Sequence, residues 1–354
     1  MTLKTATQTA AQSVLKSKLL LGAGVIAAAL LALAALAYPA AKRREQVQPG
    51  TVVQNQNPVE SGSQAPLVPP VPPAENIRLT NTKVIAHGAY PTWSPDGKWI
   101  VFGKGLKGGG LFIMDAEGKN PPKEIGSPYA SSFGAVWTAD SREIFYRERI
   151  RIQPPPYFKS TFQSVDIYNG KITPHSELDG KFYSLDELPI LIQATKPSDP
   201  ILYFQHPERV DKTLGFVWAR TKDGRKNWLV TPKKGGYWNL RLSPDKTKLL
   251  LQEGDMFIYA TDGTGLLQDL GEGSSPTWSP DGKVILFDYG TSDGHVTLTS
   301  DLYVVNADGT GRKQITFALD ILEWVPQWSP DGKHVLFGDL KTGAIYTADV
   351  ETDS

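Results

Sequence analysis

The sequence contains no cysteine, which excludes disulfide bonds, thiol catalysis and cysteine metal ligands. It also lacks any excess of charge, because 37 basic side chains balance 37 acidic ones. A balanced chain has no electrostatic footprint for nucleic acid. The five histidines show no short metal-ligand spacing. We therefore expect no cofactor, no metal site and no nucleic-acid partner.

Long apolar runs are also scarce, and the longest is the uncharged stretch LLLGAGVIAAALLALAALA at residues 19–37. A helix of this length spans about 28 Å at ~1.5 Å per residue, close to the thickness of a bilayer core. A cleaved signal peptide is the alternative, because Ala35-Leu36-Ala37 has a small-x-small form, but the run is longer than a usual signal region. We expect a short tail over residues 1–18 and a transmembrane anchor, or uncleaved signal, over residues 19–37. Lysine and arginine flank both ends, so charge leaves its orientation open.

Residues 38–76 form the next segment, which is rich in proline and glutamine. From Glu45 to Asn76 the segment has no basic side chain and few large apolar ones, so it cannot bury a core of its own. Its prolines keep such a chain extended. We expect a disordered, semi-stiff linker here, with the folded body at residues 77–354.

The body contains one motif three times. PTWSPDGKWIVF at 91–102 returns as PTWSPDGKVILF at 276–287 and as PQWSPDGKHVLF at 326–337. Proline presets φ in the turn, aspartate can accept bonds from turn amides, and glycine tolerates positive φ. The apolar runs on either side are short and β-branched or aromatic. Each copy is therefore expected to be a β-hairpin.

Weaker copies raise the number to six, marked by an aromatic residue or its substitute: Trp93, Trp137, Tyr183, Leu242, Trp278 and Trp328. The third marker is open, since Ser198-Asp199-Pro200 before ILYF could hold that turn instead. A spacing of about 46 residues fits four-stranded propeller blades. We predict an all-β, six-bladed β-propeller in which Thr82 to Ala86 completes the last blade. The structural repeat residues are expected to be Trp93, Asp96, Gly97, Trp137, Asp140, Asp245, Trp278, Asp281, Gly282, Trp328, Asp331 and Gly332.

The combination of WSPDGK with LYVVNADGTGRKQIT at 302–316 resembles the WD-like, PD40-type propeller repeat of the TolB-like family. The resemblance covers about residues 77 to 352. It implies a bacterial cell-envelope protein that works outside the inner membrane, which would put the propeller on the periplasmic side. TolB proteins have a mixed α/β domain ahead of the propeller, and here an anchor and a linker stand in that place.

Motifs for catalysis or cofactor binding have simpler explanations. GKGLKG at 103–108 matches the dinucleotide pattern but leads into a strand and not a helix. NADGTG at 306–311 resembles the start of a calcium loop but has no glutamate at the twelfth position. The sequence has no G-x-S-x-G motif to pair with a histidine. We assign no catalytic residue.

Aromatic residues just before the innermost strands are the best candidates for a binding surface at the mouth of the central channel. They are Tyr90, Phe133, Phe182, Tyr237, Trp238 and Trp324, and Asp179, Glu272, Asp320 and Glu323 lie near them in sequence. Aromatic anchors with a charged rim are typical of protein interfaces. The alternative is that each ring packs between neighbouring blades.

The sequence thus favours a membrane-anchored envelope binding module with an unidentified protein partner. An exported glycosidase or polysaccharide lyase, using channel carboxylates as acid and base, is the alternative function. An assembly factor that scaffolds other envelope proteins is a third possibility.

Overall fold

The structure of this protein is a computed structural model that describes residues 70–105, 109–151, 158–176, 200–205 and 215–352. The chain divides into two units. The larger unit consists of Pro69–Thr291 and Thr297–Ser354, and the smaller consists of Met1–Val68 and Ser292–Val296. Only the five residues Ser292–Val296 are described in the smaller set, where the Asp293 carboxylate accepts bonds from the amides of His295 and Val296. The larger unit contains the β-sheets of the protein.

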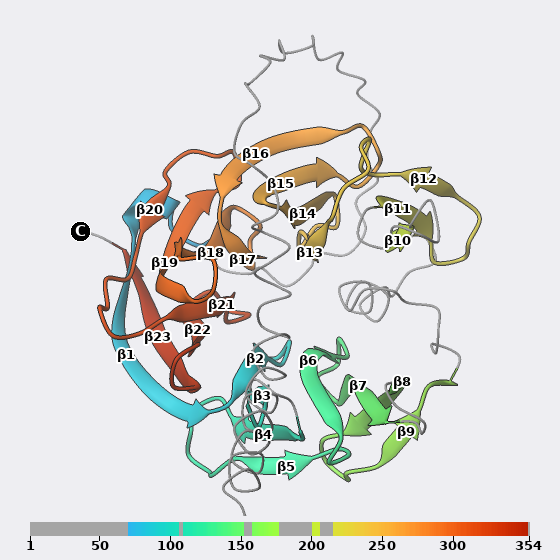
Figure 1. The fold of residues 1–354 in the computed structure, drawn as a ribbon, viewed down its shortest axis with the longest axis vertical. Coiled ribbons are helices and arrows are strands. Elements are labelled where there is room, and N and C mark those ends of the chain that lie inside the picture. The colour runs from blue at the N-terminus through green and yellow to red at the C-terminus, as the bar shows by residue number, and fades with distance from the viewer. Residues whose placement is uncertain (1–69, 106–108, 152–157, 177–199, 206–214, 353–354) are drawn as a thin grey trace, which may run out of the picture. The chain divides into compact units, whose positions relative to one another are not determined.

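The described residues of this unit form six separate β-sheets, which succeed one another around a ring (Figure 1). We number them as blades. Blade 1 has β2 (Ala89–Trp93), β3 (Trp99–Gly103), β4 (Leu111–Asp115) and β5 (Lys123–Ile125). Blade 2 has β6 (Ala130–Trp137), β7 (Glu143–Arg151), β8 (Phe158–Asp166) and β9 (Ile172–Pro174). Blade 3 shows three described strands, β10 (Pro200–Gln205), β11 (Phe216–Thr221) and β12 (Asn227–Leu229).

The second half of the ring repeats the pattern. Blade 4 has β13 (Trp238–Leu242), β14 (Lys248–Glu253), β15 (Asp255–Ala260) and β16 (Leu266–Glu272). Blade 5 has β17 (Ser274–Trp278), β18 (Val284–Ser292), β19 (Thr297–Asn306) and β20 (Lys313–Gln314). Blade 6 has β21 (Glu323–Trp328), β22 (His334–Asp339), β23 (Ala344–Thr352) and β1 (Ile77–His87). The prediction of an all-β, six-bladed propeller is confirmed.

The ring closes through blade 6, whose sheet order is β1-β23-β22-β21. Strand β1 pairs antiparallel with β23 from Ile77 opposite Thr352 to His87 opposite Ala344. Two distant parts of the sequence thus share one sheet, in which β1 is the outermost strand and β23 is paired on both sides. The predicted completion of the last blade by Thr82 to Ala86 is confirmed.

The hairpin turn between the first and second strand of a blade owes its shape to a serine and an aspartate. The Ser94 hydroxyl donates to the Asp96 carboxylate at 2.6 Å and accepts a bond from the Trp99 amide at 2.9 Å. The Asp96 carboxylate also accepts a bond from the Lys98 amide. Gly97 adopts a φ of 72° in this turn. The same serine–aspartate bond joins Ser243 to Asp245, Ser279 to Asp281 and Ser329 to Asp331.

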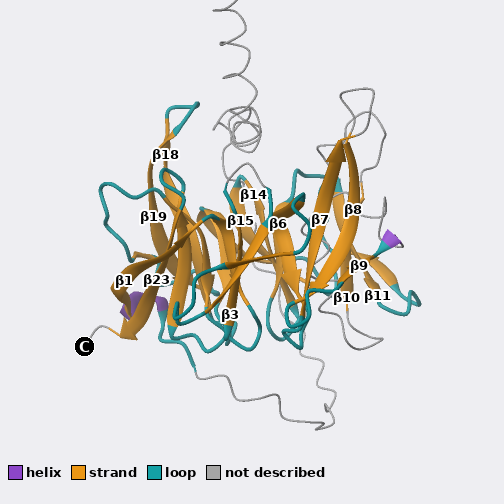
Figure 2. Ribbon diagram, turned by 90° about the horizontal axis from the view of Figure 1, so that it is seen from below, coloured by secondary structure: helices purple, strands orange, loops and turns teal. Residues whose placement is uncertain are grey.

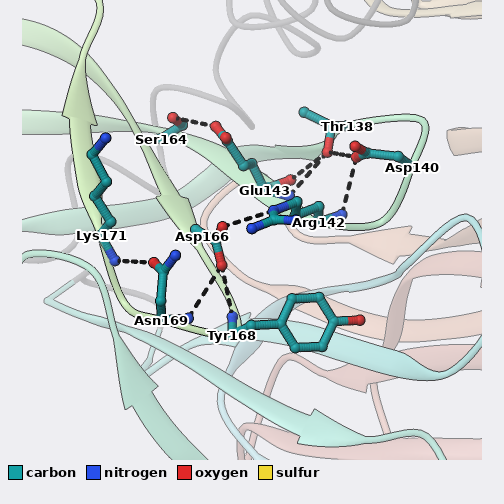
Figure 3. A network of polar contacts seen from close by, with 9 residues as sticks. All are labelled: Thr138, Asp140, Arg142, Glu143, Ser164, Asp166, Tyr168, Asn169 and Lys171. Atoms are coloured by element: carbon teal, nitrogen blue, oxygen red, sulfur yellow. Dashed lines mark hydrogen bonds and ion pairs between the residues drawn. The ribbon is translucent and has the colours of Figure 1, made fainter.

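Blade 2 builds this turn from different residues (Figure 3). Thr138 replaces the serine, and its hydroxyl donates to Asp140 at 2.6 Å and accepts a bond from the Glu143 amide. Ser141 takes the place of the glycine and still adopts a φ of 59°. A left-handed conformation costs a non-glycine residue about 1–2 kcal/mol, so packing of the ring maintains it. Blade 4 has Lys246 at the same position with a φ of 62°.

The turns of neighbouring blades pack against each other, which explains why the motif repeats. A side chain added at Gly282 would lie 3.3 Å from Pro244 of blade 4, and one added at Gly332 would lie 3.9 Å from Pro280 of blade 5. The glycine and the proline of the motif are therefore partners across these two seams. Between the sheets, buried side chains form apolar cores, such as Val284, Leu286, Trp328, Val335 and Phe337 between blades 5 and 6.

Several predictions fall on residues outside the described ranges, including the anchor at 19–37, the marker Tyr183 and most of the linker. The folded body begins upstream of Ile77, since Pro70 to Asn76 are described and include a 3-10 helix at Ala74–Asn76. Within the described part of the chain, no helix is long and apolar enough to cross a membrane.

Candidate functional site

The candidate site is the group of residues at the N-terminal ends of the innermost strands, which we call the mouth surface. These ends lie opposite the Ser-Pro-Asp-Gly turns, because each innermost strand runs from the mouth surface to its turn. The first strands β2, β6, β13, β17 and β21 lie nearest the centre of the ring (Figure 1), and Figure 2 shows the sheets from the side.

Four of the innermost strands contain a β-bulge of one extra residue, and the register of a fifth, β6, shifts by more between Ser131 and Val136. In β21, Trp324 pairs with Gly338 and Gln327 pairs with Leu336. Two residues of β21 therefore lie between these pairs, opposite a single residue of β22. The register of β2, β13 and β17 shifts in the same way. One residue in each bulge has a positive φ although it is not glycine: Tyr90 (52°), Asn239 (54°), Ser275 (50°) and Val325 (44°). Strained, bulged positions of this kind re-aim side chains and often occur at functional sites.

Two predicted anchors meet across the closing seam of the ring. The Tyr90 ring of blade 1 lies 4.9 Å from the Trp324 ring of blade 6, at an interplanar angle of 63°. This edge-to-face geometry is favourable for aromatic pairs. Both side chains are half-buried, and burial raises the pKa of the Tyr90 hydroxyl. The Trp324 indole covers Gly338, where an added side-chain carbon would lie 2.5 Å from the indole nitrogen. Only glycine therefore fits opposite this ring.

Trp238 is half-buried at the start of β13, directly before the bulge residue Asn239. The Asn239 amide group donates to the Gln252 side chain at 2.9 Å, and Gln252 donates in turn to the carbonyl of Gly273, which directly precedes β17 of blade 5. A single buried glutamine thus ties the bulge of blade 4 to the next blade. This link holds the backbone beside Trp238 in place.

Asp288 occupies the equivalent position in blade 5, where it pairs with Ser274. Its carboxylate accepts a bond from the Val325 amide of blade 6 at 3.1 Å, and the side chain is only 7% exposed. Burial raises the pKa of Asp288 to about 6, although hydrogen bonds from Ser275 and Val325 oppose the shift. This carboxylate joins the bulges of two blades at the mouth surface.

Glu323 was expected on a charged rim, and that expectation is wrong because its side chain is 2% exposed. Its carboxylate accepts bonds from the Thr316 hydroxyl and from the Leu302 amide, the latter at 3.0 Å. Burial raises the pKa of Glu323 to about 7, and nearby Asp301 and Asp339 add to the rise. Glu323 therefore joins blade 6 to blade 5 inside the protein.

The other predicted mouth residues have mixed positions. Tyr237 is 7% exposed and packs in the core shared by blades 3 and 4, where its hydroxyl donates to the Lys233 carbonyl at 2.8 Å. Tyr237 thus belongs to the core and not to the mouth surface. Phe133 lies on β6, and Phe182 lies outside the described residues.

Two of the predicted rim carboxylates are at the surface. Glu272 is exposed at the end of β16, where the Tyr289 hydroxyl donates to its carboxylate at 2.6 Å. Asp320 is exposed in the loop before β21. Asp179 lies outside the described residues. The structure therefore brings no described pair of predicted rim carboxylates together at the surface.

One serine–histidine contact has the residue types of a catalytic triad. His175 Nε2 lies 2.9 Å from the Ser164 hydroxyl, which donates to the Glu143 carboxylate at 2.7 Å (Figure 3 shows this second bond). In a catalytic triad the carboxylate orients the histidine, and the serine is accessible to substrate. Here the carboxylate binds the serine, and Ser164 is fully buried. The contact is structural. Within the described ranges, no three His, Asp or Glu side chains gather as a possible metal site.

Sequence analysis missed the buried polar links of the mouth surface and one exposed apolar loop. Asp288 and Gln252 each come directly after an apolar run, in VILFD and KLLLQ, and a polar residue in that place was the available signal. The loop between β20 and β21 exposes Phe317 and Leu319, of which Leu319 is entirely solvent-accessible. The pattern of apolar residues in the sequence does not distinguish these two residues from core residues.

No protein-family model and no curated protein matches the chain. Solved propeller structures do match it. TolB from Acinetobacter baumannii is 15% identical, with a TM-score of 0.43 over 80% of this chain. The chain spans 66% of that protein's length. A putative TolB from Agrobacterium tumefaciens is 16% identical, with a TM-score of 0.48 over 75% of this chain and 90% of its own. An oligogalacturonate lyase in complex with manganese is 17% identical, with a TM-score of 0.41 over 74% of this chain and 76% of its own. By its sheet topology the chain is a six-bladed β-propeller, similar to solved structures of TolB.

Proposed function

We propose that this protein is a cell-envelope binding module of the TolB-like propeller type, which engages a protein partner through its mouth surface. The observation that carries the proposal is the Tyr90–Trp324 pair, in which aromatic rings from two blades meet at 4.9 Å on strained strand ends. Aromatic side chains that are already ordered lose little entropy on binding, which is why they dominate interface energetics.

The support for this surface is geometric. Tyr90 and Val325, the residue after Trp324, both have positive φ, and the Asp288 carboxylate of a third strand holds the Val325 amide. The rings are thus presented by a backbone that neighbouring blades fix in place. Preorganised contact groups of this kind favour specific binding of a rigid partner over nonspecific association with many proteins.

The proposed setting is the inner membrane, with residues 19–37 as a single-pass anchor and residues 38–69 as the tether. The propeller would then lie on the periplasmic side. The resemblance of the WSPDGK repeat to TolB-like proteins and the uncharged run at 19–37 support this placement. Fractionation of the native chain, with protease treatment of intact spheroplasts as the second step, tests both the attachment and the side of the membrane.

Photo-crosslinking in cells tests the binding surface. A photoreactive amino acid replaces Trp238 or Trp324, and a third strain carries it at Trp99 as the matched control. Trp99 is also a half-buried tryptophan, but it lies at the start of β3 beside the turn, at the opposite end of the blade. We expect the photoreactive residue to crosslink the same envelope protein from position 238 and from position 324. We expect no crosslink to that protein from position 99.

The double variant Trp238→Ala/Trp324→Ala gives the affinity readout once that partner is purified. Interface hot spots contribute about 2 kcal/mol or more, so we expect binding to weaken by roughly 30-fold or more while circular dichroism stays unchanged. Unchanged binding by a folded double variant would refute the proposal. Capture of glycans only, together with turnover of a polysaccharide, would favour the exported-enzyme alternative.

A further inference from the structure

The last blade lacks one connection that blades 4 and 5 use to cover their neighbours. In blade 4, the turn between β15 and β16 reaches back to blade 3, where the Trp228 indole donates to the Thr261 carbonyl at 2.5 Å. In blade 5, Arg312 comes after the equivalent turn and donates to the Leu270 and Glu272 carbonyls of blade 4. Blade 6 has no such turn, because its third strand β23 and its fourth strand β1 come from opposite ends of the described chain.

Residues 70–76, PVPPAEN, contact blade 5 from the position where that turn would be. The Val71 amide donates to the Asp281 carboxylate at 3.0 Å, and the Ala74 amide donates to the Asn306 side-chain oxygen at 2.9 Å. Asn306 also donates to the Glu75 carboxylate at 3.0 Å, and the Lys313 ammonium donates to the Glu75 carbonyl. All four contacts lead from blade 6 to blade 5.

The local sequence suits this contact. Residues 70–74 contain three prolines, so Val71 and Ala74 carry the only backbone N–H groups there, and both are bonded to blade 5. The Val71 side chain is 6% exposed and packs with the apolar core between blades 5 and 6. Prolines also restrict the unbound chain, which lowers the entropic cost of ordering the segment.

Asn306 makes two of its three side-chain hydrogen bonds to residues 70–76. The corresponding residue of blade 4 is Ala260, in the turn YATDGTG compared with VVNADGTG, and that turn forms without an asparagine. Asp308 supplies two of the turn bonds of blade 5, because its carboxylate accepts from the amide and hydroxyl of Thr310. The Asn306 side chain is therefore available to bind the segment as well as Thr310.

We propose that Pro70–Asn76 is a closing strap that substitutes for the missing turn and locks blade 6 onto blade 5. The strap also fixes where the upstream chain enters the propeller, which is at the face of the Ser-Pro-Asp-Gly turns beside Asp281. A partner at the mouth surface would then approach from the side opposite this entry point. That last consequence rests on the proposed function, whereas the strap itself does not.

The absence of cysteine makes the strap directly measurable in the full-length chain. A single Val71→Cys substitution reports docking of the strap through its rate of modification by a thiol reagent. Leu266→Cys, at a side chain that is 51% exposed, gives the rate for an accessible thiol. We expect Val71→Cys to react at least 100-fold more slowly than Leu266→Cys. Equal rates would overturn the proposal.

Asn306→Ala is the second arm, because it removes the bonds to Ala74 and Glu75. We expect it to accelerate modification of Val71→Cys about tenfold and to leave Leu266→Cys unchanged. Asp308→Asn is the matched control, since it weakens the bonds to Thr310 within the same turn and leaves the bonds from Asn306 to the strap in place. It should change neither rate. An Asn306→Ala effect no larger than that of Asp308→Asn would also overturn the proposal.

Hydrogen exchange keeps the test independent of the cysteine variants. In the unsubstituted chain, the amides of Val71 and Ala74 should be protected, and Asn306→Ala should remove that protection. Fast exchange at both amides in the unsubstituted protein would contradict a docked strap. Neither readout depends on a partner, so a failure of the proposed function leaves this result intact.

Discussion

Replacing Asp288 by asparagine is expected to change how the stability of the propeller depends on pH. The carboxylate is 7% exposed and receives its hydrogen bonds from the neutral groups of Ser275 and Val325. Burial raises its pKa from 3.8 to about 6. At about 1.4 kcal/mol per pKa unit, holding this group ionised in the folded protein costs roughly 3 kcal/mol.

The sign depends on which state binds the proton more tightly. The folded state holds the Asp288 proton more tightly than the unfolded chain, so the contribution of Asp288 to stability is most favourable below pH ~4 and falls as pH rises from about 4 to about 6. Above that window both states are ionised and the loss is constant. Asparagine is never charged and keeps an acceptor for the Val325 amide, although it gives up a charge-assisted bond of about 1 kcal/mol.

We therefore expect Asp288→Asn to be more stable than the original protein by about 2 kcal/mol at pH 7.5, with no advantage at pH 4. Urea unfolding at a series of pH values measures the difference. Glu323 also titrates in this range but is present in both proteins, so the difference isolates Asp288. A stability difference that stays constant between pH 4 and pH 8 would refute this reasoning.

Two further predictions concern the repeat itself. Lys246→Gly should raise the free energy of unfolding by about 0.5–1 kcal/mol, because Lys246 holds a φ of 62° where other copies have glycine. Ser141→Gly should raise the free energy of unfolding by less, because it removes the hydroxyl that accepts a bond from the Asp96 amide. Urea unfolding of both variants measures the two free energies, and equal increases would contradict this prediction. Trp278→Phe should cost about 1 kcal/mol more than Trp328→Phe, because the Trp278 indole donates to the Arg241 carbonyl at 3.0 Å whereas the buried Trp328 indole N–H has no partner among the described residues. Equal losses in thermal unfolding would show that this bond contributes nothing.

The repeat was predictable because its chemistry is local. Ser94, Asp96 and Gly97 form their turn within a few residues, and the apolar runs on either side identify strands without reference to the rest of the chain. Even Ser141 and Lys246, which lack the glycine, occupy the expected turns. The completion of blade 6 was also predictable, since β1 remained as a strand without a blade of its own.

The candidate site was less predictable, since burial at strand ends depends on the neighbouring blade. Tyr237 and Trp238 are adjacent in sequence, yet Tyr237 is in a core and Trp238 is half-buried at the mouth surface. A bulge reverses the side to which a residue points, and no residue type marks the bulges at Asn239, Ser275 and Val325.

The sequence by itself determined the strand content, the turn chemistry and the number of blades, because these depend on residues close together in the chain. Only the tertiary structure decided which groups meet across the seams. Asp288 and the Val325 amide are 37 residues apart, and Ala74 and Asn306 are 232 residues apart. Such contacts exist only once the ring has closed, since closure brings the end of one blade against the next.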